Sequence, residues 1–135
     1  AQEVIERYPD REIIVTGHSL GGGLAQAVGA ALSLETVAFN SAPVPDDFFD
    51  KHPPERVGEA LNEIIHVISD VHDPVSNTAA KDADHITSLR SLFDFDDKEI
   101  MPEPKKLKKL RLDRHGITDL VENASSLLSI YRNGW

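Results

Sequence analysis

The 135-residue sequence contains no cysteine. This absence excludes disulfide bridges, thiolate metal ligands and a cysteine nucleophile, so the chemistry of the chain must use oxygen or nitrogen groups. The sequence also lacks any run of about 18 apolar residues, so no membrane-spanning helix is expected. Its first residues lack the basic and then apolar build of a signal peptide, and the localisation stays unknown on this basis.

Basic residues are outnumbered: 14 Lys and Arg stand against 23 Asp and Glu, giving a net charge of −9. Affinity for nucleic acid comes mainly from Lys and Arg that neutralise phosphates, so nucleic acid is not an expected partner. With 40% hydrophobic residues, the length and composition predict one soluble domain at most.

The basic residues that are present gather near the end of the chain. Six of the 14 lie in KKLKKLRLDR (105–114). This segment is expected either to meet the anionic head groups of a lipid surface or to protect an exposed edge strand from pairing with other chains. The residues support the second interpretation at least as well as the first.

The first half of the chain shows a strand, a helix and a second strand in close succession. EIIVTG (12–17) is a short β-branched run, LGGGLAQAVGAALSL (20–34) has apolar residues at helical spacing, and TVAFNS (36–41) is apolar again. Such a unit requires two parallel strands with the helix on one face. IIHVIS (64–69) predicts a third strand, so the fold class is α/β, with a parallel sheet and helices on both faces.

Weaker patterns complete the expected architecture. Further helices are expected over 1–10, 54–63, 83–93 and 117–132, and a fourth strand over 107–112.

Metal-binding patterns are absent or incomplete. The acidic cluster Asp94, Asp96, Asp97 and Glu99 lacks the glycine and the remaining ligands of a calcium-binding loop, so a solvated acidic loop is expected. The histidines His52, His66 and His72 have no metal-ligand spacing. No metal site and no cofactor are predicted.

The segment Gly17-His18-Ser19-Leu20-Gly21 matches the G-x-S-x-G nucleophile elbow and occupies the required place, after a strand and at the start of a helix. A bare match arises by chance in many chains, but the flanking strand and helix favour the functional interpretation. In such an elbow the serine backbone is strained, and Gly17 and Gly21 avoid the clashes that side chains would cause.

The helix that follows Ser19 is suited to stabilising negative charge. Its first N–H groups and positive dipole end point to where a carbonyl oxygen would become an oxyanion, and the backbone N–H of Leu20 is the expected first donor. Three glycines in the first turn, residues 21–23, each cost up to about 1 kcal/mol relative to alanine. A close approach by backbone or substrate is therefore expected there.

A serine nucleophile needs a histidine base and a carboxylate that orients this base, and on this type of sheet they follow in the order serine, acid, histidine. The third strand ends into DVHDPVSN (70–77), which offers two carboxylates. Asp73 in the loop is preferred. Asp70 is the alternative, although a carboxylate there also suits a turn in which it binds nearby backbone N–H groups.

Two histidines follow Asp73, and they differ in their surroundings. His115 lies between the expected last strand and the last helix, where the base belongs, whereas His85 lies in a polar stretch and is expected to be solvated. His18, inside the elbow, is expected to pack or to support the site.

Three segments resemble the class 3 lipases, a branch of the α/β-hydrolases. They are ERYPDREIIVTGHSLGGGLAQAVGAAL (6–32), TVAFNSAP (36–43) and IIHVISDVHDPVS (64–76). Bacterial lipase-like proteins, including secreted phospholipase effectors, share the longer GHSLGGGLAQ form, which is compatible with a secreted bacterial parent.

The resemblance implies Ser19 as nucleophile, Asp73 as acid and His115 as base. It also implies that lipid or other carboxylic esters are hydrolysed through an acyl-enzyme without a cofactor.

In that family about half of the sheet, the lid and the second oxyanion donor come from sequence upstream of the resembling segments. Residues 1–135 are therefore expected to be the C-terminal portion of one α/β-hydrolase domain, with an upstream segment or a second chain completing the sheet. The alternatives are an inactive fragment or pseudoenzyme that binds a partner through an exposed sheet edge, and a thioesterase or peptidase on the same fold.

Overall fold

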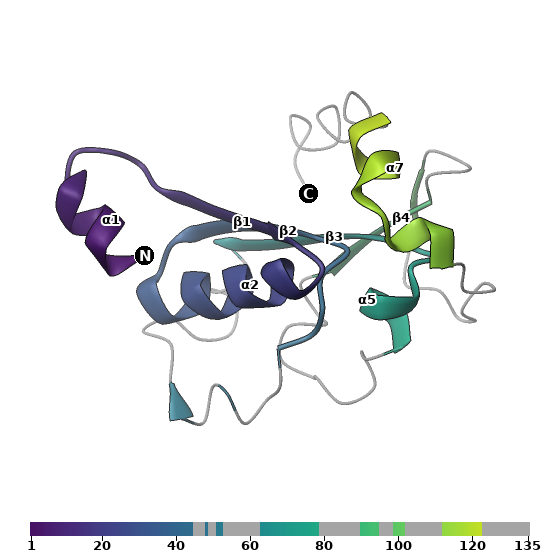
Figure 1. Cartoon of the computed structure of the whole chain (residues 1–135), viewed down its shortest axis with the longest axis horizontal. Helices are drawn as coiled ribbons and strands as arrows, with labels where there is room; N and C mark the ends of the chain where they lie inside the picture. Colours follow the sequence, from purple (N-terminus) through teal and green to yellow (C-terminus); the bar gives the residue numbers. More distant parts are fainter. Residues whose placement is uncertain are drawn as a thin grey trace.

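Five strands form one sheet in the computed structural model of the chain (Figure 1). The structure describes residues 1–44, 48, 51–52, 63–78, 90–94, 99–101 and 112–122. The strands are β1 (Ile14–His18), β2 (Glu35–Phe39), β3 (Ile65–Asp70), β4 (Arg90–Asp94) and β5 (Glu99–Met101), and they are arranged in the order β1-β2-β3-β4-β5. The first four are parallel, and β5 is antiparallel to β4. The predicted α/β class is confirmed.

The described helices are short apart from α2. They are α1 (Gln2–Arg7), α2 (Leu20–Leu32), α5 (Pro74–Thr78) and α7 (Ile117–Glu122), with a 3₁₀ turn η2 (Leu112–His115) before α7. Figure 1 shows α2 along one side of the sheet and α7 on the other side, near the ends of the strands. None of the described helices is long and apolar enough to cross a bilayer.

Small residues let α2 lie close to the sheet. Its buried residues are Gly22, Gly23, Ala25, Gln26, Ala27, Gly29 and Ala30. A Cβ atom at Gly29 would collide with Oγ1 of Thr36 on β2, so any larger residue there would push the helix away. The helix ends at Ser33, whose positive φ of 52° is the left-handed conformation common at helix ends.

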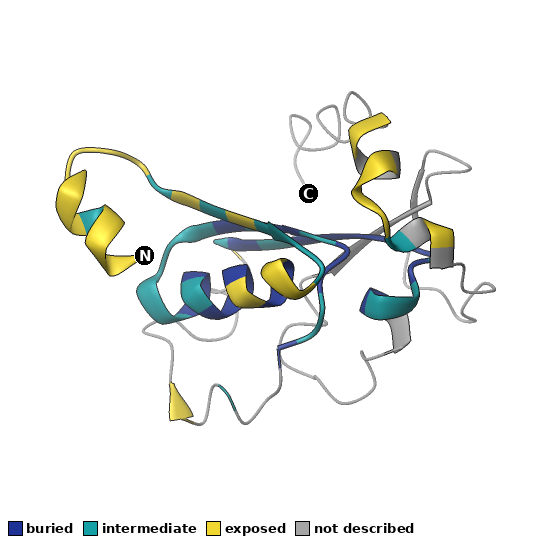
Figure 2. Ribbon diagram, in the orientation of Figure 1, coloured by how far each residue is buried: buried dark blue, intermediate teal, exposed yellow. Residues whose placement is uncertain are grey.

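The core sits between α2 and the middle of the sheet. Ala27 and Ala30 from α2 meet Ala38 on β2, together with Ile65 and Val67 on β3. Five of the six residues of β3 are buried, as expected for a strand covered on both faces. β1, at the edge of the described sheet, is more exposed, and the side chain of Ile14 is 52% exposed (Figure 2).

The two strands of the βαβ unit and the third strand lie within two residues of their predicted bounds. The helices predicted over 1–10 and 20–34 are confirmed as α1 and α2. Of the helix predicted over 117–132, the structure describes α7 at its start, and the remainder lies outside the described residues. The predicted helix 54–63 lies outside them apart from its last residue, which is in a turn.

The fourth strand of the described sheet was not predicted. Residues 90–94, assigned mostly to a helix, form β4, which pairs with β3 from Val67 to Asp70. Pairing with a buried neighbour strand outweighs local helical spacing in so short a segment. Leu112, the last residue of the expected strand 107–112, begins η2 instead, and residues 102–111 lie outside the described part of the chain.

The acidic cluster of residues 94–99, expected to be a solvated loop, lies partly in the sheet. Asp94 ends β4 and is paired in register with Glu99, the first residue of β5. The antiparallel pairing thus incorporates both ends of the cluster into the sheet, while Asp96 and Asp97 lie outside the described residues.

Candidate active site

Ser19 joins the last residue of β1 to the first residue of α2, with φ 57° and ψ −124°. A non-glycine residue at this positive φ is strained by about 1–3 kcal/mol and persists only where its surroundings hold it. Its N–H donates to the carbonyl of Phe39 at 3.1 Å, and its own carbonyl accepts from Gly22, Gly23 and Ala42 at 3.0, 3.2 and 2.9 Å. These four bonds fix the sharp turn.

The glycines around Ser19 differ in how closely other atoms approach them. A Cβ atom at Gly17 would collide with the backbone carbonyl of Gly21, whereas one at Gly21 would meet nothing within 4 Å among the described residues. Cβ atoms at Gly22 and Gly23 would approach Ser41 Oγ to 2.8 Å and the carbonyl oxygen of Ala42 to 3.1 Å. The expected clash at Gly21 is therefore wrong: it is the backbone of Gly21 that requires a glycine at position 17.

The structure brings together the three side chains predicted to carry the chemistry. Ser19 Oγ lies 2.6 Å from His115 Nε2, and His115 Nδ1 lies 2.8 Å from Asp73 Oδ1. Because an ionised carboxylate only accepts hydrogen bonds, the Nδ1 atom carries the hydrogen, and Nε2 is left to accept from the Ser19 hydroxyl. The side chain of Asp73 is fully buried and that of His115 is 25% exposed, so the histidine ring borders solvent.

Asp73 is held by the first turn of α5. Its Oδ2 accepts hydrogen bonds from the hydroxyl of Ser76 and from the N–H of Ser76 at 2.9 Å, and the N–H of Val75 lies 3.3 Å from Oδ1. This is the arrangement of an aspartate at a helix N-cap, with proline at the first helical position. Sequence reasoning missed Ser76, although the Asp-Pro-x-Ser spacing carries that signal.

Asp70 has a different environment. Its Oδ1 accepts from the backbone N–H of His72 at 2.6 Å, and its own N–H donates to Asn40 Oδ1 at 2.8 Å. These bonds match the turn-forming role considered for it, and the carboxylate that contacts the His115 ring is that of Asp73. Asn40, with φ 41°, was not singled out from the sequence.

Leu20, the expected oxyanion donor, lies at the start of α2. Leu20 is the first residue of this helix, so its N–H has no intrahelical acceptor. Among the described residues no other acceptor for it is recorded. The role of the Leu20 N–H stays a prediction.

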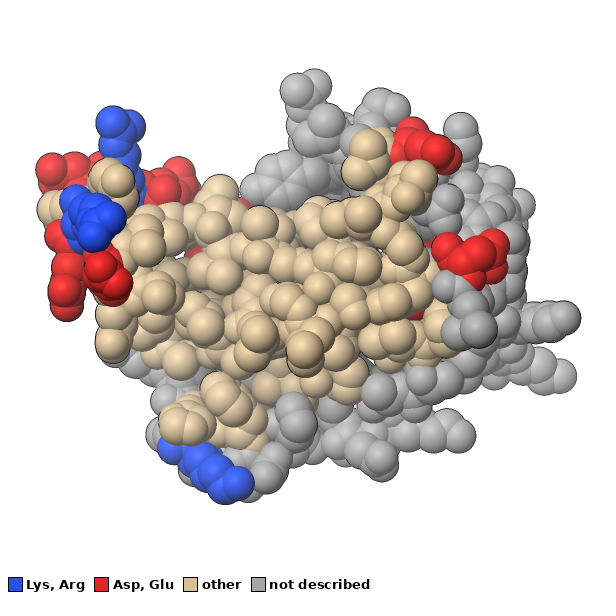
Figure 3. All heavy atoms as spheres, viewed as in Figure 1, with Lys and Arg blue, Asp and Glu red and all other residues tan. Residues whose placement is uncertain are grey.

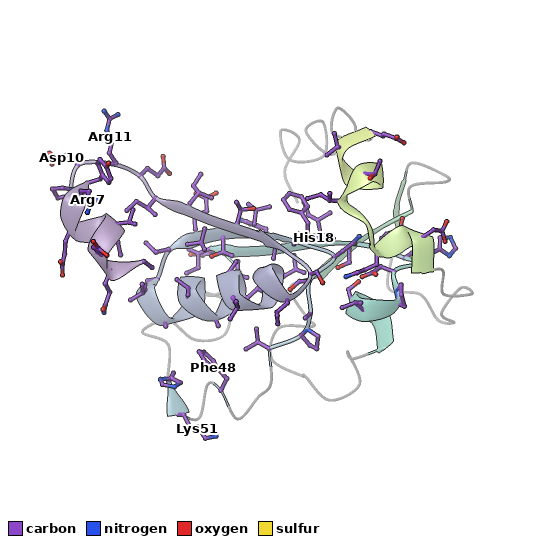
Figure 4. All side chains as sticks on the ribbon, in the orientation of Figure 1. Arg7, Asp10, Arg11, His18, Phe48 and Lys51 are labelled. Carbon is purple, nitrogen blue, oxygen red and sulfur yellow. The ribbon has the colours of Figure 1, made fainter. Side chains whose placement is uncertain are left out.

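Among the other histidines, His18 directly precedes Ser19 in the chain. The Nε2 atom of His18 is 2.7 Å from the carbonyl oxygen of His115. His52 stacks near Phe48, which Figure 4 labels below α2. His66 on β3 is half-buried, and this burial lowers its pKa below 6.5 against an opposing effect of Glu35. His85 lies outside the described residues.

The described part of the chain has no cluster of three possible metal ligands, and its surface beside α2 is apolar. Within the described part of the chain, no three His, Asp or Glu side chains gather closely enough to hold a metal ion. The side of α2 that faces the viewer in Figure 3 is free of Lys, Arg, Asp and Glu, in agreement with the helix sequence. An apolar groove runs beside α2 and is lined by Ala1, Gln2, Leu24, Ala27, Val28, Ala31, Leu32, Phe48 and His52. Ser19 and His115 are not among its lining residues.

A family model for the Tle-like phospholipase domain matches residues 2–89. The chain belongs to this family. The matched range contains Ser19 and Asp73 and ends before His115, so the family match does not include the residue expected to be the base. The lipase-like character expected from the sequence is confirmed at this level.

Named lipases are similar to parts of this chain. The putative lipase ATG15 of Saccharomyces cerevisiae (strain ATCC 204508 / S288c) is 55% identical over 38 residues, which are 28% of this chain and 7% of that protein. The putative lipase ATG15 of Mycosarcoma maydis is 33% identical over 92 residues, 60% of this chain and 17% of that protein. The chain thus spans less than a fifth of the length of these relatives. The structure of Lip2 lipase from Yarrowia lipolytica aligns with 69% of this chain and 36% of its own, at 24% identity and a TM-score of 0.43.

Proposed function

We propose that the protein is a serine hydrolase of carboxylic esters, and that its substrates are lipids, as for a lipase or phospholipase. The observation that carries this proposal is the continuous chain of contacts from Ser19 Oγ through the His115 ring to Asp73, with distances of 2.6 and 2.8 Å. Membership of the Tle-like phospholipase family supports the lipid substrate. Within the lipases we place the chain near class 3, on the GHSLGG segment (17–22).

The first half of the reaction makes an acyl-enzyme. Ser19 Oγ attacks the ester carbonyl carbon while His115 Nε2 takes the hydroxyl proton, and Asp73 stabilises the imidazolium that results. The carbonyl oxygen becomes an oxyanion, to which the N–H of Leu20 donates at the positive end of α2. The tetrahedral intermediate then expels the alcohol, which receives the proton from His115.

The second half regenerates the serine. Water attacks the acyl carbon as His115 removes one of its protons, and collapse of the second tetrahedral intermediate releases the carboxylic acid while the proton returns to Ser19. No metal or cofactor takes part in this scheme. The strained backbone of Ser19 keeps its hydroxyl at the strand end throughout both halves.

Covalent labelling tests the proposal directly. A fluorophosphonate probe is expected to modify Ser19 of the purified protein, as located by peptide mass spectrometry, and Ser19→Ala is expected to abolish both labelling and hydrolysis. A series of short-chain esters, long-chain triacylglycerols and glycerophospholipids then identifies the substrate, with a thioester and a peptide as competitors. A folded protein that neither labels nor hydrolyses any ester would overturn the proposal and favour partner binding through the β1 edge.

A further inference from the structure

His18 is the last residue of β1 and directly precedes Ser19, and its side chain reaches the segment that carries His115. Its Nε2 atom lies 2.7 Å from the backbone carbonyl oxygen of His115, which is 97 residues away in sequence. The two imidazole rings are 5.2 Å apart between centroids and tilted by 32°. Figure 4 labels His18 at the end of β1, beside the ribbon that leads into α7.

The direction of this hydrogen bond follows from its chemistry. A carbonyl oxygen can only accept, so His18 must carry a hydrogen on Nε2 and donate it. His115 is thereby held at both ends: its ring lies between Ser19 and Asp73, and its backbone carbonyl accepts from His18.

The backbone of His115 lies in a short element. His115 ends the single 3₁₀ turn η2, which packs against α5, and among the described residues a Cβ atom placed at the following residue, Gly116, would meet only the carbonyl of Asp113, at 3.8 Å. A shift of this backbone would carry the ring with it. Because His18 and Ser19 are adjacent at the end of one strand, a bond from His18 sets the backbone of the base relative to the nucleophile.

We propose that His18 is a positioning residue, which holds the His115 backbone through its Nε2–H so that the His115 ring meets the Ser19 hydroxyl. This inference rests on the proposed function, since it concerns the same serine and histidine. The proposal assigns this role to the Nε2–H donor of His18 and not to the packing of its ring.

Two substitutions separate the donor from the ring. His18→Gln keeps an N–H donor at nearly the same distance from the backbone, while His18→Phe keeps a planar ring and loses the donor. Kinetics on a soluble short-chain p-nitrophenyl ester and rates of fluorophosphonate labelling are measured for both, with thermal unfolding as a check on folding. His52→Phe, at the ring that stacks near Phe48, is the matched control.

We expect His18→Phe to lower kcat and the labelling rate by about 10- to 100-fold, the effect of misplacing a catalytic group by about 1 Å. KM should change little, because the bond acts on the base and not on substrate binding. His18→Gln is expected to recover most of this loss, and His52→Phe should behave as the wild type. Equal rates for His18→Phe and His18→Gln, whether high or low, would overturn the proposal.

A spectroscopic measurement on the wild-type protein is independent of activity. In ¹⁵N NMR of the imidazole rings, His18 is expected to carry a hydrogen on Nε2, and an Nε2 atom without hydrogen would overturn the proposal even if His18→Phe does not fold. If His18 shows the expected hydrogen on Nε2 but the wild type never labels, the proposed function fails while the contact to His115 stands.

Discussion

Ser76 donates two hydrogen bonds to the same carboxylate oxygen of Asp73, one from its hydroxyl and one from its backbone N–H at 2.9 Å. The other oxygen of that carboxylate accepts from His115 Nδ1 at 2.8 Å. With one oxygen fixed by the first turn of α5, the carboxylate cannot rotate freely. Its second oxygen therefore faces the histidine ring in a constant direction.

Loss of the Ser76 hydroxyl should accordingly loosen Asp73. For Ser76→Ala we expect a decrease of about 1.5–3 kcal/mol in the free energy of unfolding, because a hydrogen bond to a buried charged group is removed. Labelling of Ser19 should also slow. Urea denaturation and labelling rates measure the two effects.

Ser69→Ala provides a matched control. Ser69 on β3 is also fully buried, but its hydroxyl has no hydrogen-bond partner among the residues that the structure describes. Its removal should leave the free energy of unfolding within about 0.5 kcal/mol of the wild type or raise it. Equal losses in the two variants would show that the Ser76 hydroxyl contributes nothing specific.

The two glycines that define the elbow motif should respond in opposite ways to alanine. In Gly17→Ala the new methyl group would collide with the backbone carbonyl group of Gly21, so we expect the free energy of unfolding to fall by about 3 kcal/mol, the upper end of the usual cost of overpacking. In Gly21→Ala the new methyl group would have no atom of the described residues within 4 Å. Alanine should stabilise the first turn of α2 by up to about 1 kcal/mol relative to glycine. Denaturant titration of both variants is decisive, and a strongly destabilised Gly21→Ala would contradict the prediction.

The half-buried His66 should give part of the pH dependence of stability. Burial lowers its pKa below 6.5, so between its folded pKa and 6.5 the unfolded chain binds more protons than the folded one. Its contribution to stability is therefore fully present above pH 6.5 and is lost as the pH falls towards the folded pKa. His66→Gln should remove this contribution. When the free energy of unfolding is measured against pH, the wild type should therefore lose more stability than His66→Gln as the pH falls below 6.5. Equal losses in the two proteins would refute the prediction.

Contiguous sequence patterns predicted β1, the turn at Ser19 and α2. The run Ile13-Ile14-Val15, the Gly-His-Ser-Leu-Gly turn and the periodic helix after it are contiguous, and the structure forms β1, the strained Ser19 and α2 there. The choice of Asp73 as the residue that contacts His115 also agrees with the structure, because the carboxyl ends of parallel strands meet at one edge of the sheet.

Features that depend on distant pairing were not predictable in this way. β4 is a strand because β3 offers it a partner from Val67 to Asp70, and nothing within residues 90–94 encodes that partner. The bond from His18 to the His115 carbonyl joins residues 97 apart, and no spacing rule predicts it. The error at Gly21 has a similar cause, since the motif names both glycines but only the structure shows which one would clash.

The two carboxylates after β3 give the sharpest test of the proposed mechanism. Asp73→Asn keeps the shape of the side chain but removes the charge that would stabilise the His115 imidazolium, and it favours the wrong histidine tautomer, so kcat should fall about 10³- to 10⁴-fold. Asp70→Asn keeps the Oδ1 acceptor for the N–H of His72 and should retain kcat within about 10-fold, after correction for the folded fraction by circular dichroism. Both residues are fully buried, so a general effect of changing a buried charge would appear in both variants. A large loss in Asp70→Asn together with normal turnover in Asp73→Asn would transfer the role of acid to Asp70 and break the proposed chain from Ser19 to Asp73.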